Sequence, residues 1–214
     1  AVPNIDAIVP RIGVNLVKAM PNIVPRYYSS ELSIEAPYFN EDPYGLSVDA
    51  HFISPSGKET IRHGFYDDGF KVRFAPTEIG TYSYYVTAAD ERSTFRSQTN
   101  QFNVVESNSH GFVHVSARNP HYLEFDDGTP FYPVGINTGW WFYESQAQYM
   151  KDHNINLGRV WMCSWHINIE PELGNYSETA AQQLDNILAL AEEYDIYIQL
   201  SLIHISEPTR QAEI

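Results

Sequence analysis

Two similar stretches, Phe131–Trp141 and Asn156–Trp165, constrain the fold of this chain most. Each is a short β-type run whose C-terminal end breaks into aromatic and polar residues, and a helical pattern follows each one. Repeated strand–helix units predict parallel strands joined by crossover helices. In a parallel α/β barrel, the residues just past the C-terminal ends of the strands form the active-site face. We therefore expect residues 131–199 to form the first strand–helix units of a (β/α)8 TIM barrel.

The residues at these two strand ends favour contacts with sugars. Indole rings stack on the apolar C–H faces of sugar rings, while arginine and asparagine hydrogen-bond to hydroxyls and carboxylates. A place in the core is the alternative for any single tryptophan, because tryptophan is highly buried on average. Clustering at two successive strand ends favours the binding interpretation. The candidate substrate-binding residues are Asn137, Trp140, Trp141, Trp161, Trp165 and His166, and Arg159 lies among them.

Residues 27–106 alternate between apolar and polar with a period of two, which predicts half-buried strands. Three turn sequences between these runs each place a glycine where a tight turn needs positive φ. Several short strands at this spacing predict an antiparallel, immunoglobulin-like β-sandwich. The turns are Pro55–Gly57, Asp67–Gly69 and Glu78–Gly80; the alternation places Lys71, Arg73, Ser83 and Tyr85 on the outer face.

The remaining segments are expected to support these two parts. Residues 1–26 contain four prolines and predict an extended lead-in with a strand around Ile12–Val17. Residues 107–130 predict a connector hairpin. A first helix is expected over Ser145–Asp152, with Ala147 and Met150 inward and Asn154 as a left-handed cap. A second is expected from an N-cap at Ser177 to Tyr194, with Leu184, Ile187, Leu188 and Ala191 inward, before a third strand at Ile196–Gln199.

The composition excludes several classes of binding partner. The formal net charge of −14 argues against nucleic acid or an anionic membrane, because both require a basic surface. No apolar run is long enough to span a bilayer. Cys163 is the single cysteine, so no intrachain disulfide forms, and no His/Cys spacing matches a zinc site. We expect a carbohydrate substrate and no metal, cofactor or protein partner.

The acid pairs Asp67-Asp68 and Asp126-Asp127 are candidates for a metal site or an acid/base couple. A glycine follows each pair directly and β-type runs flank it, which is typical of tight turns. We therefore interpret both pairs as turn residues.

Several motifs resemble parts of known carbohydrate-active enzymes. Pro55-Ser-Gly-Lys58, Gly64-Phe-Tyr66 and Lys71-Val-Arg-Phe-Ala-Pro76 resemble a β-sandwich domain of unknown function that precedes the catalytic barrels of many bacterial glycoside hydrolases. Phe125-Asp-Asp-Gly-Thr-Pro-Phe131 and Gly135-Ile-Asn137 resemble the junction into such a barrel, and Asn156–Met162 is similar to its second strand. The resemblance implies a cellulase-like, clan A retaining hydrolase and an extracellular or periplasmic location, with any signal peptide outside the given chain.

In that family an arginine matching Arg159 supports the catalytic nucleophile, a carboxylate from the seventh strand. The acid/base glutamate follows the fourth strand. Because the pattern here reaches only a third strand, we expect both catalytic carboxylates to be missing and this chain to be inactive. Glu144, Glu170 and Glu172 are the acids nearest the expected face, and we interpret Glu170 and Glu172 as loop or rim residues.

Residues 200–214, Leu-Ser-Leu-Ile-His-Ile-Ser-Glu-Pro-Thr-Arg-Gln-Ala-Glu-Ile, resemble a translated sequencing adapter. We expect an artefact appended to a truncated gene, with a natural tail as the alternative. His204 and Glu207 are therefore left out of the candidate site.

Two functions follow as hypotheses. The first is a fragment of a retaining glycoside hydrolase that acts on polysaccharide or oligosaccharide. The second is a non-catalytic carbohydrate-binding or cell-surface adhesion module built on the sandwich.

Overall fold

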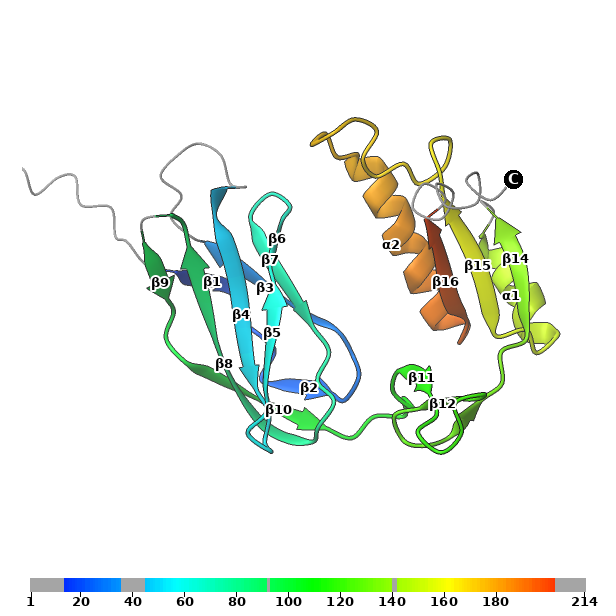
Figure 1. The fold of residues 1–214 in the computed structure, drawn as a ribbon, viewed down its shortest axis with the longest axis horizontal. Helices are drawn as coiled ribbons and strands as arrows, with labels where there is room; N and C mark the ends of the chain where they lie inside the picture. The colour runs from blue at the N-terminus through cyan, green and yellow to red at the C-terminus, as the bar shows by residue number, and fades with distance from the viewer. Residues whose placement is uncertain (1–13, 36–44, 92, 140–141, 203–214) are drawn as a thin grey trace, which may run out of the picture. The chain divides into compact units, whose positions relative to one another are not determined.

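The computed structural model describes residues 14–35, 45–91, 93–139 and 142–202. The chain divides into two compact units, Ala1–Pro130 and Phe131–Ile214. The described ranges contain sixteen strands and two helices (Figure 1). Neither helix in these ranges is long and apolar enough to cross a membrane.

The first unit contains a sandwich of two sheets (Figure 1). Neighbouring strands are antiparallel, except that β10 and β2 run parallel. The smaller sheet has the order β1 (Asn15–Lys18), β3 (Ser30–Glu35), β7 (Phe70–Phe74) and β6 (Phe65–Tyr66). The larger has the order β2 (Ile23–Pro25), β10 (Asn100–Val105), β8 (Gly80–Ala89), β4 (Ser47–Ile53) and β5 (Glu59–His63), with β9 (Thr94–Arg96) paired to β8.

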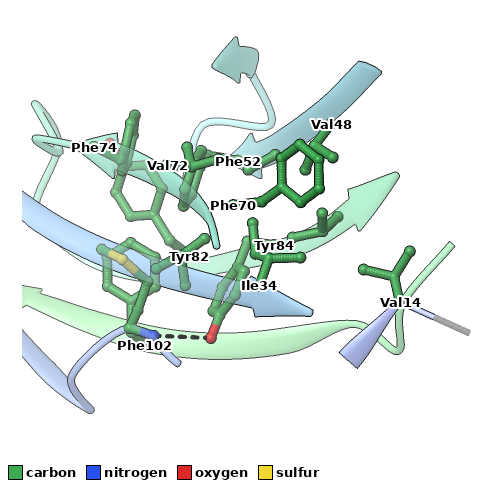
Figure 2. Close-up of a cluster of buried hydrophobic side chains, with 14 of the residues drawn as sticks. Val14, Ile34, Val48, Phe52, Phe70, Val72, Phe74, Tyr82, Tyr84 and Phe102 are labelled. Carbon is green, nitrogen blue, oxygen red and sulfur yellow. Dashed lines mark hydrogen bonds between the residues drawn. The ribbon is translucent and has the colours of Figure 1, made fainter. Parts of the chain in front are cut away.

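The predicted alternation accounts for the sandwich core. Successive side chains of a strand point to opposite faces, so every second residue of β4, β7 and β8 is buried. Figure 2 shows this core, in which the rings of Phe52 and Phe74 stack with centroids 3.9 Å apart. The Tyr84 hydroxyl accepts a hydrogen bond from the Met20 backbone N–H at 3.1 Å, which satisfies a polar group inside the core. The predicted outer-face residues Lys71, Arg73, Ser83 and Tyr85 are all more exposed than their inward neighbours.

Residues 14–25 belong to this sandwich, although their sequence predicts a lead-in. They supply β1 and β2, and Val14, Met20 and Val24 are buried in the core. Pro25 lies in β2, the edge strand of its sheet, which is where a strand tolerates a residue without an N–H. β1 overlaps the strand expected around Ile12–Val17, whereas the prolines hid β2.

The predicted connector contains most of a small sheet, whose strands are β11 (Val113–Val115), β12 (Leu123–Phe125) and β13 (Pro130–Phe131). Both acid pairs lie in turns, as predicted: Asp68 has φ 46° and Gly128 has φ 83°. The carboxylate of Glu124 is buried and accepts hydrogen bonds from Arg118 and Ser116, which lower the pKa of that carboxyl.

The second unit alternates strands and helices: β14 (Gly135–Gly139), α1 (Glu144–Asp152), β15 (Leu157–Met162), α2 (Glu178–Glu193) and β16 (Tyr197–Leu202). The strands are parallel in the order β14-β15-β16 (Figure 1). Side chains from both helices pack with Val160 in one core. Ser177 caps α2 and Asn154 is left-handed with φ 56°, as predicted, whereas the inward prediction for Leu188 is wrong because it is 46% exposed.

The prediction that residues 131–199 form the first units of a (β/α)8 barrel is wrong. The described chain is mostly β, with two helices, and its parallel sheet is an open one of three strands. Strand–helix periodicity is a local property that any β-α-β unit shares. Closure depends on strand number and stagger, which this pattern does not encode.

Candidate functional site

A polar row crosses the face of the parallel sheet that the helices do not cover. Asn137 on β14 pairs in register with Arg159 on β15, and Arg159 pairs with Gln199 on β16. All three side chains are exposed, while Gly158 and Val160 beside Arg159 are buried on the helix side. Because parallel strands in register place equivalent side chains next to one another, the row forms one continuous hydrogen-bonding surface.

Arg159 is held at the centre of this row. Its Nη2 donates a hydrogen bond to Ser201 Oγ at 2.9 Å, and its Cζ lies 5.9 Å from the centroid of the Trp161 ring, two residues further along the same face. Arg159 makes no ion pair with any residue that the structure describes. Most of its N–H donors therefore remain available to a ligand.

A bulge at the end of β14 shapes the row. The register shifts between Asn137 and Gly139, and Gly139 has φ 62°. Asn137 Oδ1 accepts a hydrogen bond from the Gly139 backbone N–H at 3.3 Å, and Thr138 Oγ1 donates to the Arg159 carbonyl at 2.8 Å. These bonds tie Asn137 and Arg159 into one local structure. They leave the Asn137 amide group free to donate to a ligand.

Trp165 and His166 follow β15 in a tight turn. Trp165 is 67% exposed, whereas His166 is half-buried and its Nδ1 lies 3.4 Å from Gln183 Nε2 of α2. His166 Nε2 is buried, with no hydrogen-bond partner among the described residues. Burial lowers the pKa of His166 and so favours the neutral imidazole.

The remaining candidate site residues lie away from the polar row or outside the described residues. Trp140 and Trp141 lie outside the described residues, as does the tail beyond residue 202. Glu144 lies in the first turn of α1, and Glu170 Oε1 accepts a hydrogen bond from the Gly174 N–H at 2.9 Å within its own loop. No group of three or more His, Cys, Asp or Glu side chains in the described ranges is arranged to hold a metal.

Two residues of this region were missed in the sequence. Gln199 completes the polar row, and the alternation of Ile196-Tyr-Ile-Gln199 could have placed it there. Ile167 has φ 50°, a conformation that sequence alone does not predict for a β-branched residue.

Comparisons with known proteins bear on both units. The family model described as "Domain of unknown function (DUF5060)" matches residues 23–89, which span β2 to β8 of the sandwich. No curated protein matches the chain in sequence.

Among solved structures, the chain is similar to a protein from Bacteroides vulgatus ATCC 8482 that is provisionally named as a glycoside hydrolase. The TM-score is 0.64 and the identity 19%, over 85% of this chain and 41% of that one. A family 39 glycoside hydrolase from Bacteroides cellulosilyticus WH2 gives 13% identity over 91% of this chain and 35% of its own, with a TM-score of 0.29.

The first likeness concerns the fold alone, because the sequences have diverged so far. The chain spans about two fifths of that neighbour's length, as its 41% coverage gives. The chain therefore combines a DUF5060-like region with a fold related to that of a protein named as a glycoside hydrolase.

Proposed function

We propose that this chain is part of a glycoside hydrolase that acts on O-glycosidic bonds of polysaccharide or oligosaccharide. In this proposal the second unit supplies a substrate-binding face, and the sandwich is an accessory domain. The observation that carries the proposal is the exposed row of Asn137, Arg159 and Gln199, with Trp161 beside it. Amide and guanidinium donors suit sugar hydroxyls, and an indole suits the apolar face of a sugar ring.

The row binds and orients rather than cleaves. Retaining hydrolysis requires two carboxyl groups roughly 5 Å apart across the glycosidic bond. No acidic residue lies in register with this row on the described strands. We propose that both carboxylates belong to polypeptide outside this chain, that Arg159 supports the nucleophile among them, and that the whole enzyme acts outside the cytoplasm.

The alternative is a binding module whose recognition surface lies on the sandwich. Tyr85 is the aromatic residue of its outer face with the strongest claim to such a role. However, the Tyr85 ring stacks on His51 with centroids 4.5 Å apart, and Arg96 Cζ lies 3.7 Å from its centroid. Because protein groups occupy this ring, it offers little surface for a sugar.

Affinity electrophoresis in gels that contain glucomannan, xylan or mixed-linkage β-glucan tests the proposal. We expect at least one polysaccharide to retard the full chain and Arg159→Gln to abolish that retardation. Arg62→Gln, which removes an exposed strand arginine from the sandwich, is the matched control and should be retarded like the original chain. Retardation that survives Arg159→Gln but disappears in Tyr85→Ala would favour the binding module. The chain alone should show no hydrolysis.

A further inference from the structure

The turn that follows β15, residues 163–167, is buried at both ends and exposed in its middle. The Cys163 N–H donates to the His166 carbonyl at 2.8 Å, and the His166 N–H donates to the Cys163 carbonyl at 3.0 Å. Cys163 and Ile167 are 3% and 2% exposed. Trp165, between them, is 67% exposed.

Ile167 adopts a conformation that its side chain disfavours. Its φ is 50°, in the left-handed region, where a β-branched residue is a genuine outlier. The Ile169 N–H donates to the Ile167 carbonyl at 3.1 Å, so the chain folds back within three residues. Such strain persists only where the surrounding structure imposes it, and it gathers at functional sites.

The surroundings that impose the strain are visible. The Ile167 side chain belongs to the core that also contains Met150 of α1, Val160 of β15 and Ile187 of α2, and Ile169 packs against that core. A glycine at position 167 would relieve the backbone but would leave that core without an anchor. Trp165 lies two residues before Ile167, just past the carboxyl end of β15. Because Ile167 is anchored inward, the turn directs Trp165 outward.

We propose that Ile167 is a positioning residue, whose buried side chain and left-handed backbone hold Trp165 outward to stack on a pyranose ring of the substrate. The choice of a sugar as ligand rests on the proposed function, but the positioning of Trp165 does not. His166 follows Trp165 in the same turn, and its link to Gln183 ties the turn to α2.

The test uses the full chain with Ile167→Gly, Ile167→Val and Ile187→Ala. Ile167→Gly removes both the anchor and the strain, whereas Ile167→Val keeps a β-branched anchor. Ile187→Ala opens a cavity in the same core without altering the turn and controls for a merely structural role. Acrylamide quenching of Trp165, assigned by difference against Trp165→Phe, reports the position of the indole. Retardation in the same polysaccharide gels reports binding.

We expect Ile167→Gly to change the quenching of Trp165 and to weaken retardation about fivefold, the size of one lost aromatic stacking contact. Ile167→Val and Ile187→Ala should match the original chain in both measurements. If Ile187→Ala shifts both as much as Ile167→Gly does, Ile167 is only a core residue and the proposal is overturned. If Ile167→Gly does not fold, Trp165→Ala provides the test, because it changes an exposed residue and should leave the fold intact. Unchanged retardation of Trp165→Ala would also overturn the proposal.

If no polysaccharide retards the original chain, the proposed function fails, yet a quenching change confined to Ile167→Gly still supports the positioning of Trp165.

Discussion

The sandwich and the second unit differ in how many faces of their sheets are buried. In the sandwich, eighteen described residues form one buried core between two sheets, and it is rich in stacked aromatic rings. In the second unit, eight described residues form the core, all on the helix side of a three-stranded sheet. The opposite face carries exposed Asn137, Arg159 and Gln199.

The two regions also differ in how many contacts their exposed polar side chains make with other side chains. On the sandwich, Arg73 pairs with Glu31 at 2.9 Å, and Tyr85 lies between His51 and Arg96. On the second unit, Arg159 has no ion-pair partner among the described residues. The comparison teaches that these exposed sandwich side chains are engaged with one another, whereas Arg159 makes one hydrogen bond, to Ser201, and keeps further N–H donors exposed.

The largest expected effect is on the sandwich core. Phe52 is fully buried and stacks on Phe74, so Phe52→Ala should lower the free energy of unfolding by about 3–5 kcal/mol. Phe65→Ala, at a position 37% exposed, should cost no more than about 1 kcal/mol. Urea denaturation followed by hydrogen exchange in residues 45–91 measures both. Equal losses would mean that the core is not the main source of stability.

A second prediction concerns the junction of the sandwich with residues 107–130. Gly111 has φ 92°, and a Cβ at this position would lie 2.7 Å from Asp126 Cβ and 2.9 Å from Tyr27 Cζ. Gly111→Ala should therefore cost about 1–3 kcal/mol, since it adds a clash to an unfavourable backbone conformation. Gly57→Ala, with φ 86° and nothing within 4 Å, isolates the backbone cost and should be milder. Similar denaturation midpoints for the two variants would rule out a tight junction.

In the second unit, the N-cap of α2 should make a smaller contribution. Ser177 Oγ accepts a hydrogen bond from the Ala180 N–H at 3.3 Å. Ser177→Ala should therefore destabilise this unit by about 1 kcal/mol. Thr179→Ala, an exposed change in the same helical turn, is the control. Hydrogen exchange across residues 178–193 measures the effect, and equal exchange in both variants would contradict a capping role.

The mildest prediction is a pH dependence in the first unit. A hydrogen bond from His110, 2.6 Å away, and others from Thr129 lower the pKa of Asp127 from 3.8 to about 2. A depressed pKa in the folded state means that the ionised carboxylate stabilises the fold above pH 3.8, and that this stability is lost as the pH falls through about 2. Asp127→Asn should flatten the dependence of thermal stability on pH in that window. An unchanged acid limb would contradict the pairing with His110.

The sequence predicts those parts of the fold that depend on local periodicity. The alternation over β4, β7 and β8 identified the inward residues of the sandwich, and the spacing of Ala147 and Met150 identified the buried side of α1. The prolines at positions 21 and 25 masked β2, because its place at the edge of a sheet is not encoded locally. The closed barrel was wrong for the same reason, since closure depends on strands far apart in the chain.

The candidate site was predicted in part. Asn137 and Arg159 were identified as residues near strand ends, but the structure places them within β14 and β15, in register with each other. The pairing of Arg159 with Gln199 depends on the register of β15 and β16, which no local pattern reveals. The left-handed backbone of Ile167 results from tertiary packing, so its sequence gives no signal of it.

Hydrogen exchange of the full chain with and without a retarding polysaccharide tests the central claim most directly, because it reports both regions in one experiment. Our account predicts added protection in residues 135–139 and 157–169 and none in residues 47–63 and 80–89. Protection confined to the sandwich strands β4, β5 and β8 would contradict it and would move recognition to the sandwich.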